Sequence, residues 1–336
     1  MKAIDLIFKR KAAISIGLDI GKRRINMVKL TASAGGPKLV DFASVALKSP
    51  QNREEKLEAL KKIAQEKGIS AHPVNIGVSG ESVIVRYINL PKMSREELGQ
   101  ALAYEAQQYI PFKMEEVVLD YHILTPRVAS SSNRMKVFLV AAKKQAIMEF
   151  VELIHEAGLE PNIIDVNIFS LINCFQVNGP QLKEEDVAAL INLEFDLVNI
   201  GILQGEMPFF SRDLSVLEDF LLLQQQQQQE ENKEKGLFET IKPLLTNLIR
   251  EIRVSIDYYE SEFERQVGVV YISGEGAQIP GLLEFFKAEL GREIKTWNPL
   301  EKLLGNSTGI DSAKLNEVSP TLAVGCGLAL RGVSNK

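Results

Sequence analysis

The stretch that most constrains the fold of this chain is Ser15 to Leu30, S-I-G-L-D-I-G-K-R-R-I-N-M-V-K-L. Apolar residues alternate with small or polar ones from Ile14 to Ile20, which is the pattern of a half-buried strand. A tight turn is expected from Gly21 to Arg24, followed by a second strand from Ile25 to Leu30. Because Asp19 lies near the end of the first strand, before a turn rich in backbone N–H groups, this hairpin is either a plain surface hairpin or a site for a metal-bound phosphate.

The composition indicates a soluble protein of about two or three domains, since the chain has 336 residues, of which 45% are hydrophobic and 25% charged. A net charge of −5 gives no global argument for binding nucleic acid or an anionic membrane. No run approaches the roughly 18 apolar residues of a membrane helix. The two cysteines, Cys174 and Cys326, lie in apolar stretches. They are expected to be buried thiols, so we expect a protein of the reducing cytosol.

A second strand–turn–strand pattern echoes the first one. Strands are expected at Val187–Leu193 and Leu197–Leu203, on either side of Glu194-Phe195-Asp196. Such an internal echo indicates a duplicated architecture. Further on, the apolar strand Val269–Ser273 runs into Gly274-Glu275-Gly276-Ala277 and then a helix. A strand, a glycine turn and a helix can present backbone N–H groups to a phosphate or a base.

Between the two sets, residues 73–146 predict a compact β-α-β-β insertion with its own small sheet. Its helix begins at Ser94, with Glu97 at the spacing of a capping box, and ends at Tyr109-Ile110-Pro111-Phe112. Later in the chain, Gln224–Gln229 and the charged residues after it carry too little apolar surface to hold a fold. A loop or a frayed helix extension is expected there.

Several short stretches carry a resemblance that covers nearly the whole chain. They are Gly17-Leu18-Asp19-Ile20-Gly21, Asn89-Leu90-Pro91, Glu105-Ala106-Gln107-Gln108-Tyr109-Ile110-Pro111-Phe112, Leu119-Asp120-Tyr121, Glu251-Ile252-Arg253, Ser255-Ile256-Asp257-Tyr258-Tyr259, Ser273-Gly274-Glu275-Gly276-Ala277 and Leu328-Ala329-Leu330-Arg331-Gly332. Together they resemble the actin-like ATPase fold, and most closely the FtsA-related PilM family of type IV pilus assembly. The run E-A-Q-Q-Y-I-P-F inside the insertion is the most specific of them.

The resemblance implies an α/β protein with two duplicated, ribonuclease H-like lobes and an inserted FtsA-type β-α-β-β subdomain. The first lobe would comprise residues 12–72 and 147–184, completed by 316–333. The inserted subdomain would be 73–146. The second lobe would be 185–315, with the polar tract at 224–235 inside it.

The resemblance also implies that ATP with Mg²⁺ binds between the lobes, where Asp19 helps to hold the metal. The residues that match the family's nucleotide-binding positions are Asp19, Gly21, Lys22, Arg23, Glu251, Gly274, Glu275, Gly276 and Ala277. In the alternative interpretation, the basic turn at Lys22 to Arg24 and Glu251 do not contact nucleotide and are solvated surface charges. No catalytic residue is assigned.

The chain departs from the family pattern at several of these positions. Asn192 and Glu194 match a second phosphate motif, Asp-x-Gly, so a glutamate stands where glycine lets the backbone approach phosphate. Lys22-Arg23-Arg24 replaces small hydroxyl residues, Glu275 replaces a glycine, and Val254 replaces a basic residue. Three functions remain open: a scaffold that binds ATP with little or no turnover, a working assembly ATPase, and a nucleotide-free scaffold. The departures favour the first.

The partner implied by the family is the cytoplasmic N-terminal tail of the inner-membrane protein PilN, bound in a groove between the inserted subdomain and the first lobe. The expected contact residues are Val85, Tyr87, Leu90, Tyr104, Tyr109 and Phe112. In the alternative interpretation, the tyrosines and Phe112 only fill the subdomain core. The protein would be cytoplasmic and peripheral to the inner membrane through PilN and other pilus assembly proteins. It would bind no nucleic acid.

Two related platforms are alternatives to this assignment. A type II secretion subunit is usually fused to a membrane helix, and the division protein FtsA usually ends in an amphipathic membrane-targeting helix. The membrane helix expected of the secretion subunit is not seen in this sequence. The last residues, Arg331-Gly332-Val333-Ser334-Asn335-Lys336, are not expected to form the targeting helix of FtsA.

Overall fold

The opening hairpin forms as expected. In the computed structural model, which describes residues 14–33, 35–49, 52–124, 134–194, 197–215, 237–304 and 310–333, β1 (Ile14–Ile20) pairs antiparallel with β2 (Arg24–Thr31). The apolar residues of both strands are buried, because the two strands belong to a larger sheet. The tract at 224–235 lies outside the described residues.

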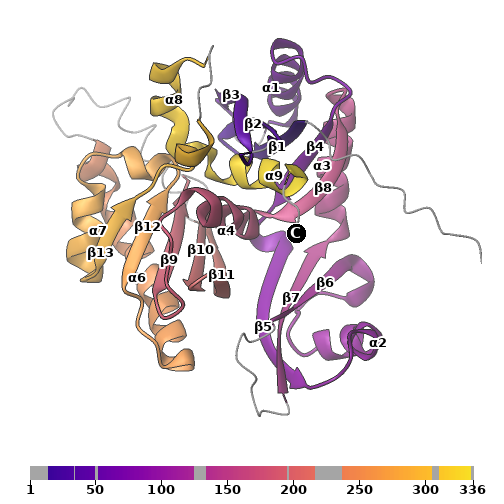
Figure 1. Cartoon of the computed structure of the whole chain (residues 1–336), viewed down its shortest axis with the longest axis vertical. Helices are drawn as coiled ribbons and strands as arrows, with labels where there is room; N and C mark the ends of the chain where they lie inside the picture. The colour runs from indigo at the N-terminus through magenta and orange to yellow at the C-terminus, as the bar shows by residue number, and fades with distance from the viewer. Residues whose placement is uncertain are drawn as a thin grey trace, which may run out of the picture.

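The first five-stranded sheet has the order β3-β2-β1-β4-β8 (Figure 1). Its other strands are β3 (Lys38–Ala46), β4 (Pro73–Val78) and β8 (Glu160–Val166). Helices α1 (Arg53–Glu66) and α3 (Lys144–Glu156) share one hydrophobic core with this sheet. Helices α4 (Asn167–Asn178) and α9 (Ala323–Val333) belong to a second core that continues into the other sheet. We call this sheet with its helices the first lobe.

The second five-stranded sheet repeats the first one strand for strand, in the order β11-β10-β9-β12-β13. Its strands are β9 (Val187–Leu193), β10 (Leu197–Gln204), β11 (Met207–Ser215), β12 (Val269–Ser273) and β13 (Glu293–Thr296). In both sheets three antiparallel strands are followed by two parallel ones. Helices α6 (Leu237–Phe263) and α7 (Leu282–Leu290) share its hydrophobic core. The duplication predicted from the sequence is therefore confirmed, and we call this half the second lobe.

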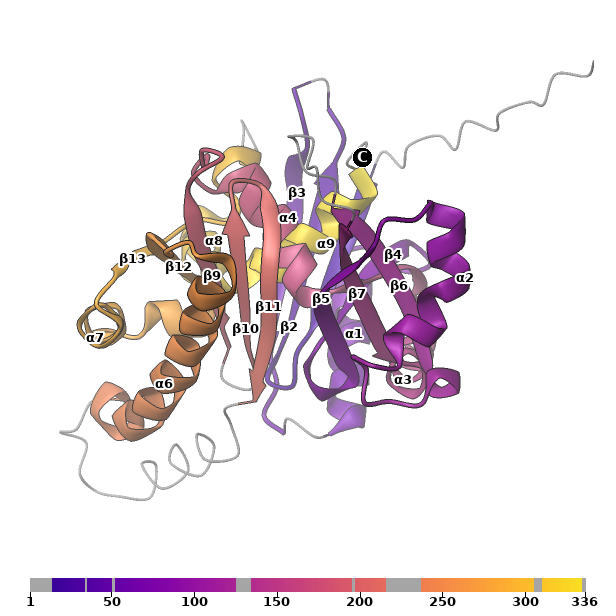
Figure 2. The ribbon, with the colours of Figure 1, turned by 90° about the horizontal axis from the view of Figure 1, so that it is seen from below.

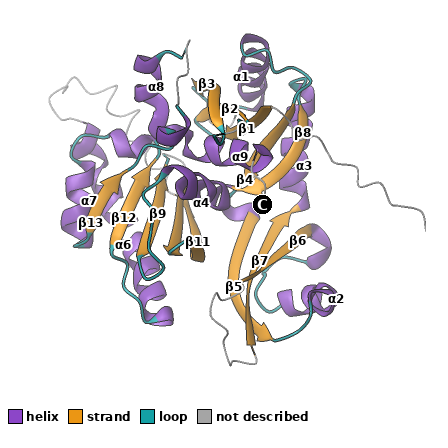
Figure 3. Ribbon diagram, viewed as in Figure 1, coloured by secondary structure: helices purple, strands orange, loops and turns teal. Residues whose placement is uncertain are grey.

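The insertion forms a separate three-stranded sheet, β5-β7-β6 (Figure 3). Its elements are β5 (Val83–Pro91), α2 (Arg95–Ala106), β6 (Val117–Leu124) and β7 (Arg134–Lys143). The predicted capping box is present, because Ser94 accepts from the Glu97 N–H and Glu97 accepts from the Ser94 N–H. We assigned residues 73–78 to this subdomain, and that strand assignment is wrong. Strand β4 lies between β1 and β8 in the first sheet, where its apolar side chains are buried.

The glycine turn after β12 leads into α7 through a single 3₁₀ turn, Glu275–Gln278, so this helix begins only at Leu282. Helix α6 ends at Phe263, and the next residue, Glu264, has a left-handed φ of 53°. The remaining helical segments are Gly80–Ser82, Met114–Glu116, Glu301–Leu303, α8 (Ser312–Val318) and Ser319–Leu322.

The helices α4 and α9 cross at the centre of the molecule, between the two sheets (Figure 2). Both cysteines lie there as buried free thiols, as predicted, and the Sγ of each donates to the Pro299 carbonyl. Among the described helices, none combines the length and the apolar character that crossing a bilayer requires.

Candidate functional site

The first hairpin carries Asp19, the residue predicted to hold the metal, near the end of β1. Its side chain is 8% exposed and accepts from Asn26 Nδ2 at 3.4 Å. Asn26 Nδ2 also donates to the Thr321 carbonyl at 3.0 Å. The Gly21 N–H closes the turn on the Arg24 carbonyl at 2.9 Å, while Lys22 is exposed. This half of the cleft offers a carboxylate that fits a metal-bound phosphate.

The matching turn of the second lobe offers different chemistry. Asn192, at the position of the family's aspartate, is 2% exposed, and its Oδ1 accepts from Ser273 Oγ at 3.0 Å. The Glu194 N–H donates to the Leu197 carbonyl at 3.2 Å and so closes the turn. The amide of Asn192 is thereby used to join neighbouring strands β9 and β12, so it serves the fold of the second lobe.

The glycines after β12 are required by packing. A Cβ on Gly274 would lie 2.5 Å from the Leu193 carbonyl oxygen, and one on Gly276 would lie 2.3 Å from the Leu193 side chain. Gly274 also has a φ of 89°, which favours glycine. The Gly274 N–H donates to the Pro320 carbonyl at 2.8 Å, and the Ala277 N–H donates to Gly274 at 3.2 Å. These two donors are committed to the protein, so they are not available to a nucleotide.

Glu275 and Glu251, both predicted to contact nucleotide, lie beside different surfaces of the protein. Glu275 forms an ion pair with Arg24 of the first hairpin. Glu251 forms its ion pair at 2.9 Å with Arg212 on β11, the edge strand three positions from β12 in the sheet. The structure therefore brings Asp19, the first turn and the glycine loop together, and places Glu251 beside a different surface.

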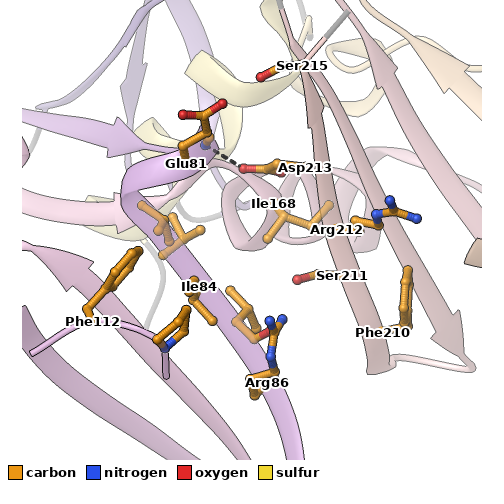
Figure 4. Close-up of a pocket in the computed structure, with 15 residues that line it drawn as sticks. Glu81, Ile84, Arg86, Phe112, Ile168, Phe210, Ser211, Arg212, Asp213 and Ser215 are labelled. Atoms are coloured by element: carbon orange, nitrogen blue, oxygen red, sulfur yellow. Dashed lines mark hydrogen bonds between the residues drawn. The ribbon is translucent and has the colours of Figure 1, made fainter. Parts of the chain in front are cut away.

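That surface borders a groove of about 470 Å³ between the inserted subdomain and the second lobe (Figure 4). Its floor and one wall are apolar, with Ile84 and Phe112 from the insertion and Ile168 from α4. The other wall is β11. Both β5 and β11 stand at the edge of their sheets, so the groove runs between two sheet edges. It lies where the insertion meets both lobes, because Val166 of the first lobe also lines it.

The charged residues of the groove are separated by sign. Glu81 and Asp213 lie at one end and Arg86 at the other, while Arg212 stands between them on the β11 wall (Figure 4), where it is paired with Glu251. Asp213 accepts from the Gly80 N–H at 2.7 Å and from Asn199 Nδ2 at 2.7 Å. Burial raises the pKa of the Asp213 carboxyl above its ordinary value, and these two hydrogen bonds oppose the shift.

A second cavity of about 360 Å³ continues the groove along β5 and β11. It is lined by an aromatic cluster in which Tyr87 contacts Phe209 and Phe263 of the second lobe. The ammonium of Lys136 lies 5.6 to 5.9 Å from the centres of these three rings. Burial raises the pKa of the Tyr87 hydroxyl. This cluster holds the insertion against the second lobe.

The predicted partner residues divide into two groups. Val85, Tyr87 and Phe112 line the groove or its continuation. Leu90 is 1% exposed in the subdomain core, and Tyr109 packs against that core. Tyr104 is 72% exposed on α2. The groove was expected between the inserted subdomain and the first lobe, whereas this one lies mainly between the insertion and β11 of the second lobe. The charged pair Arg212-Asp213 inside a strand was a signal that could have indicated the β11 side.

The duplicated five-stranded sheets, with an inserted subdomain and a cleft between them, define a protein of actin-like ATPase fold. The family model described as type IV pilus assembly protein PilM matches residues 17–333. The chain belongs to this family.

Solved structures agree with this assignment. A PilM–PilN type IV pilus biogenesis complex is similar, with a TM-score of 0.83 and 26% identity over 97% of this chain and 100% of that chain. The ethanolamine utilization protein EutJ from Carboxydothermus hydrogenoformans shares the fold, with a TM-score of 0.52 and 11% identity over 94% and 89% of the two chains. The predicted fold class is confirmed.

Proposed function

We propose that this protein is a cytoplasmic scaffold of the type IV pilus assembly machine that binds the cytoplasmic N-terminal tail of PilN in the groove between β5 and β11. The observation that carries the proposal is the groove itself, an apolar channel between two sheet edges. The similarity to a PilM–PilN complex supports the choice of partner. Binding the tail of an inner-membrane protein would hold the scaffold at the membrane surface.

The groove suits an extended peptide. An edge strand presents backbone N–H and C=O groups to a peptide that adds to the sheet, and pockets beside it select side chains. Strand β5 pairs with β7 on one side and faces the groove on the other. The apolar residues Ile84, Phe112 and Ile168 would take the peptide's apolar side chains. The groove therefore supplies both kinds of contact.

The separation of charge along the groove would set the direction of the tail. A basic group of the tail would lie toward Glu81 and Asp213, and an acidic group would lie toward Arg86. Complementary charges of this kind give specificity and raise the association rate more than they raise affinity.

Reversing one charge tests this arrangement. In a titration of a fluorescently labelled PilN tail peptide followed by anisotropy, Arg86→Glu is expected to weaken binding by about tenfold at low salt, since it places a carboxylate at the basic end. The difference should shrink as the salt concentration rises. The control is Arg95→Glu, the same change on the exposed face of α2. Equal affinities of the two variants at low salt would contradict the placement of the tail.

We further propose that Mg²⁺-ATP binds only weakly, with Asp19 toward the metal, because the second-lobe half of the cleft lacks free backbone donors at Gly274 and Ala277. In calorimetry with high micromolar protein we expect a small binding heat and a turnover below about 1 s⁻¹, the low end for phosphoryl-transfer enzymes. Asp19→Asn should remove the heat. Turnover above that rate would show a working ATPase instead.

A further inference from the structure

Two loops from opposite lobes are joined by one ion pair. Arg24, the first residue of β2, donates from Nε to Oε1 of Glu275 in the turn after β12. The residues are 251 positions apart, and their side chains are 25% and 12% exposed. The ion pair therefore joins the first lobe to the second lobe across the position that the family resemblance assigns to nucleotide.

Arg24 is held in place from its own lobe. Its Nη1 donates to Ser44 Oγ at 2.9 Å, and Ser44 Oγ donates to Asn26 Oδ1 at 2.7 Å. Asn26 in turn donates to Asp19. A continuous chain of hydrogen bonds thus runs from Glu275 through Arg24 to the carboxylate that would hold the metal.

Glu275 is held from the other side. The turn that carries it packs against Leu193 at Gly274 and Gly276, as described above. The Gly274 N–H is bound to the Pro320 carbonyl at 2.8 Å. Because the Arg24 side chain is already held by Ser44, less of its freedom is lost when the pair forms, and the pair is only partly exposed to solvent.

We propose that the Arg24–Glu275 pair is a latch that holds the first hairpin turn to the β12 turn. The two residues are departures from the family pattern at separate places in the sequence, and in the fold they are complementary. The latch concerns the cleft between the lobes and is independent of the tail groove.

Amide hydrogen exchange in the absence of nucleotide tests the latch. In Glu275→Gln, which keeps the size of the side chain, segments 21–26 and 274–279 should both exchange at least about threefold faster than in the wild type, because the opening of each turn no longer breaks an ion pair. Arg24→Gln should give the same result. The charge exchange Arg24→Glu with Glu275→Arg should slow both segments again.

The control is Arg292→Gln, which breaks the pair between Arg292 and Glu260 inside the second lobe. That pair has similar exposure, 22% and 20%, and a distance of 2.9 Å. It should leave both cleft segments unchanged. Exchange in helix α4 reports whether each variant is folded as a whole. If Glu275→Gln leaves α4 and both cleft segments at wild-type rates, or speeds only segment 274–279, the latch is refuted.

Discussion

Replacing Gly327 with alanine is expected to lower the free energy of unfolding by at least about 3 kcal/mol. Gly327 lies on α9 where this helix crosses α4, and a Cβ there would lie 1.7 Å from the carbonyl oxygen of Ser170. The obstructing atom belongs to a helix backbone, so the helices must separate before a methyl group can fit. The same crossing joins the cores of both lobes. Urea unfolding followed by circular dichroism measures the loss.

Gly99→Ala is the matched control for this prediction. Gly99 lies inside α2, where a Cβ would have only the Tyr121 hydroxyl nearby, at 3.8 Å. The same substitution should raise the free energy of unfolding by about 0.5 to 1 kcal/mol, since alanine has less freedom to lose in a helix. A destabilisation of Gly327→Ala below about 1 kcal/mol would show that α4 and α9 can shift apart more easily than their packing indicates.

Filling the groove with a large side chain is expected to abolish tail binding. Ser211 lies on β11 opposite Gly201, and it lines both the groove and its continuation. Ser211→Trp should occupy the space between β11 and Ile168 and weaken binding of the PilN tail peptide by at least about 100-fold, equivalent to about 2.8 kcal/mol. Anisotropy titration measures the affinity, and circular dichroism verifies the fold.

The control for this variant is Val118→Trp. Val118 is 47% exposed on β6, the opposite edge strand of the inserted sheet. The same bulky residue there should leave tail affinity within about twofold of the wild type, because exposed positions outside an interface contribute little. Undiminished binding by a folded Ser211→Trp protein would place the tail outside the groove.

Local patterns predicted the elements of this fold well. The strand from Ile14 to Ile20 and the capping box of Ser94 and Glu97 depend on neighbouring residues, and both are found. The strand is buried on both faces, however, so the prediction of a half-buried strand was wrong. The repeated strand–turn–strand pattern likewise predicted two lobes of equal topology. The error at β4 arose because an apolar strand fits either neighbouring sheet, and its pairing with β1 is set by contacts distant in the chain.

The residue types of the candidate sites could be predicted from the sequence, but the contacts that decide whether those residues are available to a ligand could not. The chemical types were visible in the sequence: Asp19 before a glycine turn, a glycine loop after β12, and an aromatic-rich insertion. Which of these groups are available to a ligand was not visible, because Leu193 fills the space beside the glycines and Leu90 lies inside the subdomain core. Packing decided which side chains face a groove and which face a core.

Periodicity in the sequence was enough to predict most strands and helices and the duplication, because these depend on neighbouring residues, and the short motifs were enough to show the resemblance to the family. How distant groups combine depended on the packing of the folded chain. It pairs Arg24 with Glu275, two residues that separately looked like losses of nucleotide chemistry, and it sets Asp213 against Gly80 at the end of the groove. Contacts across 251 and 133 positions depend on how two lobes and an insertion pack together, which no local pattern encodes.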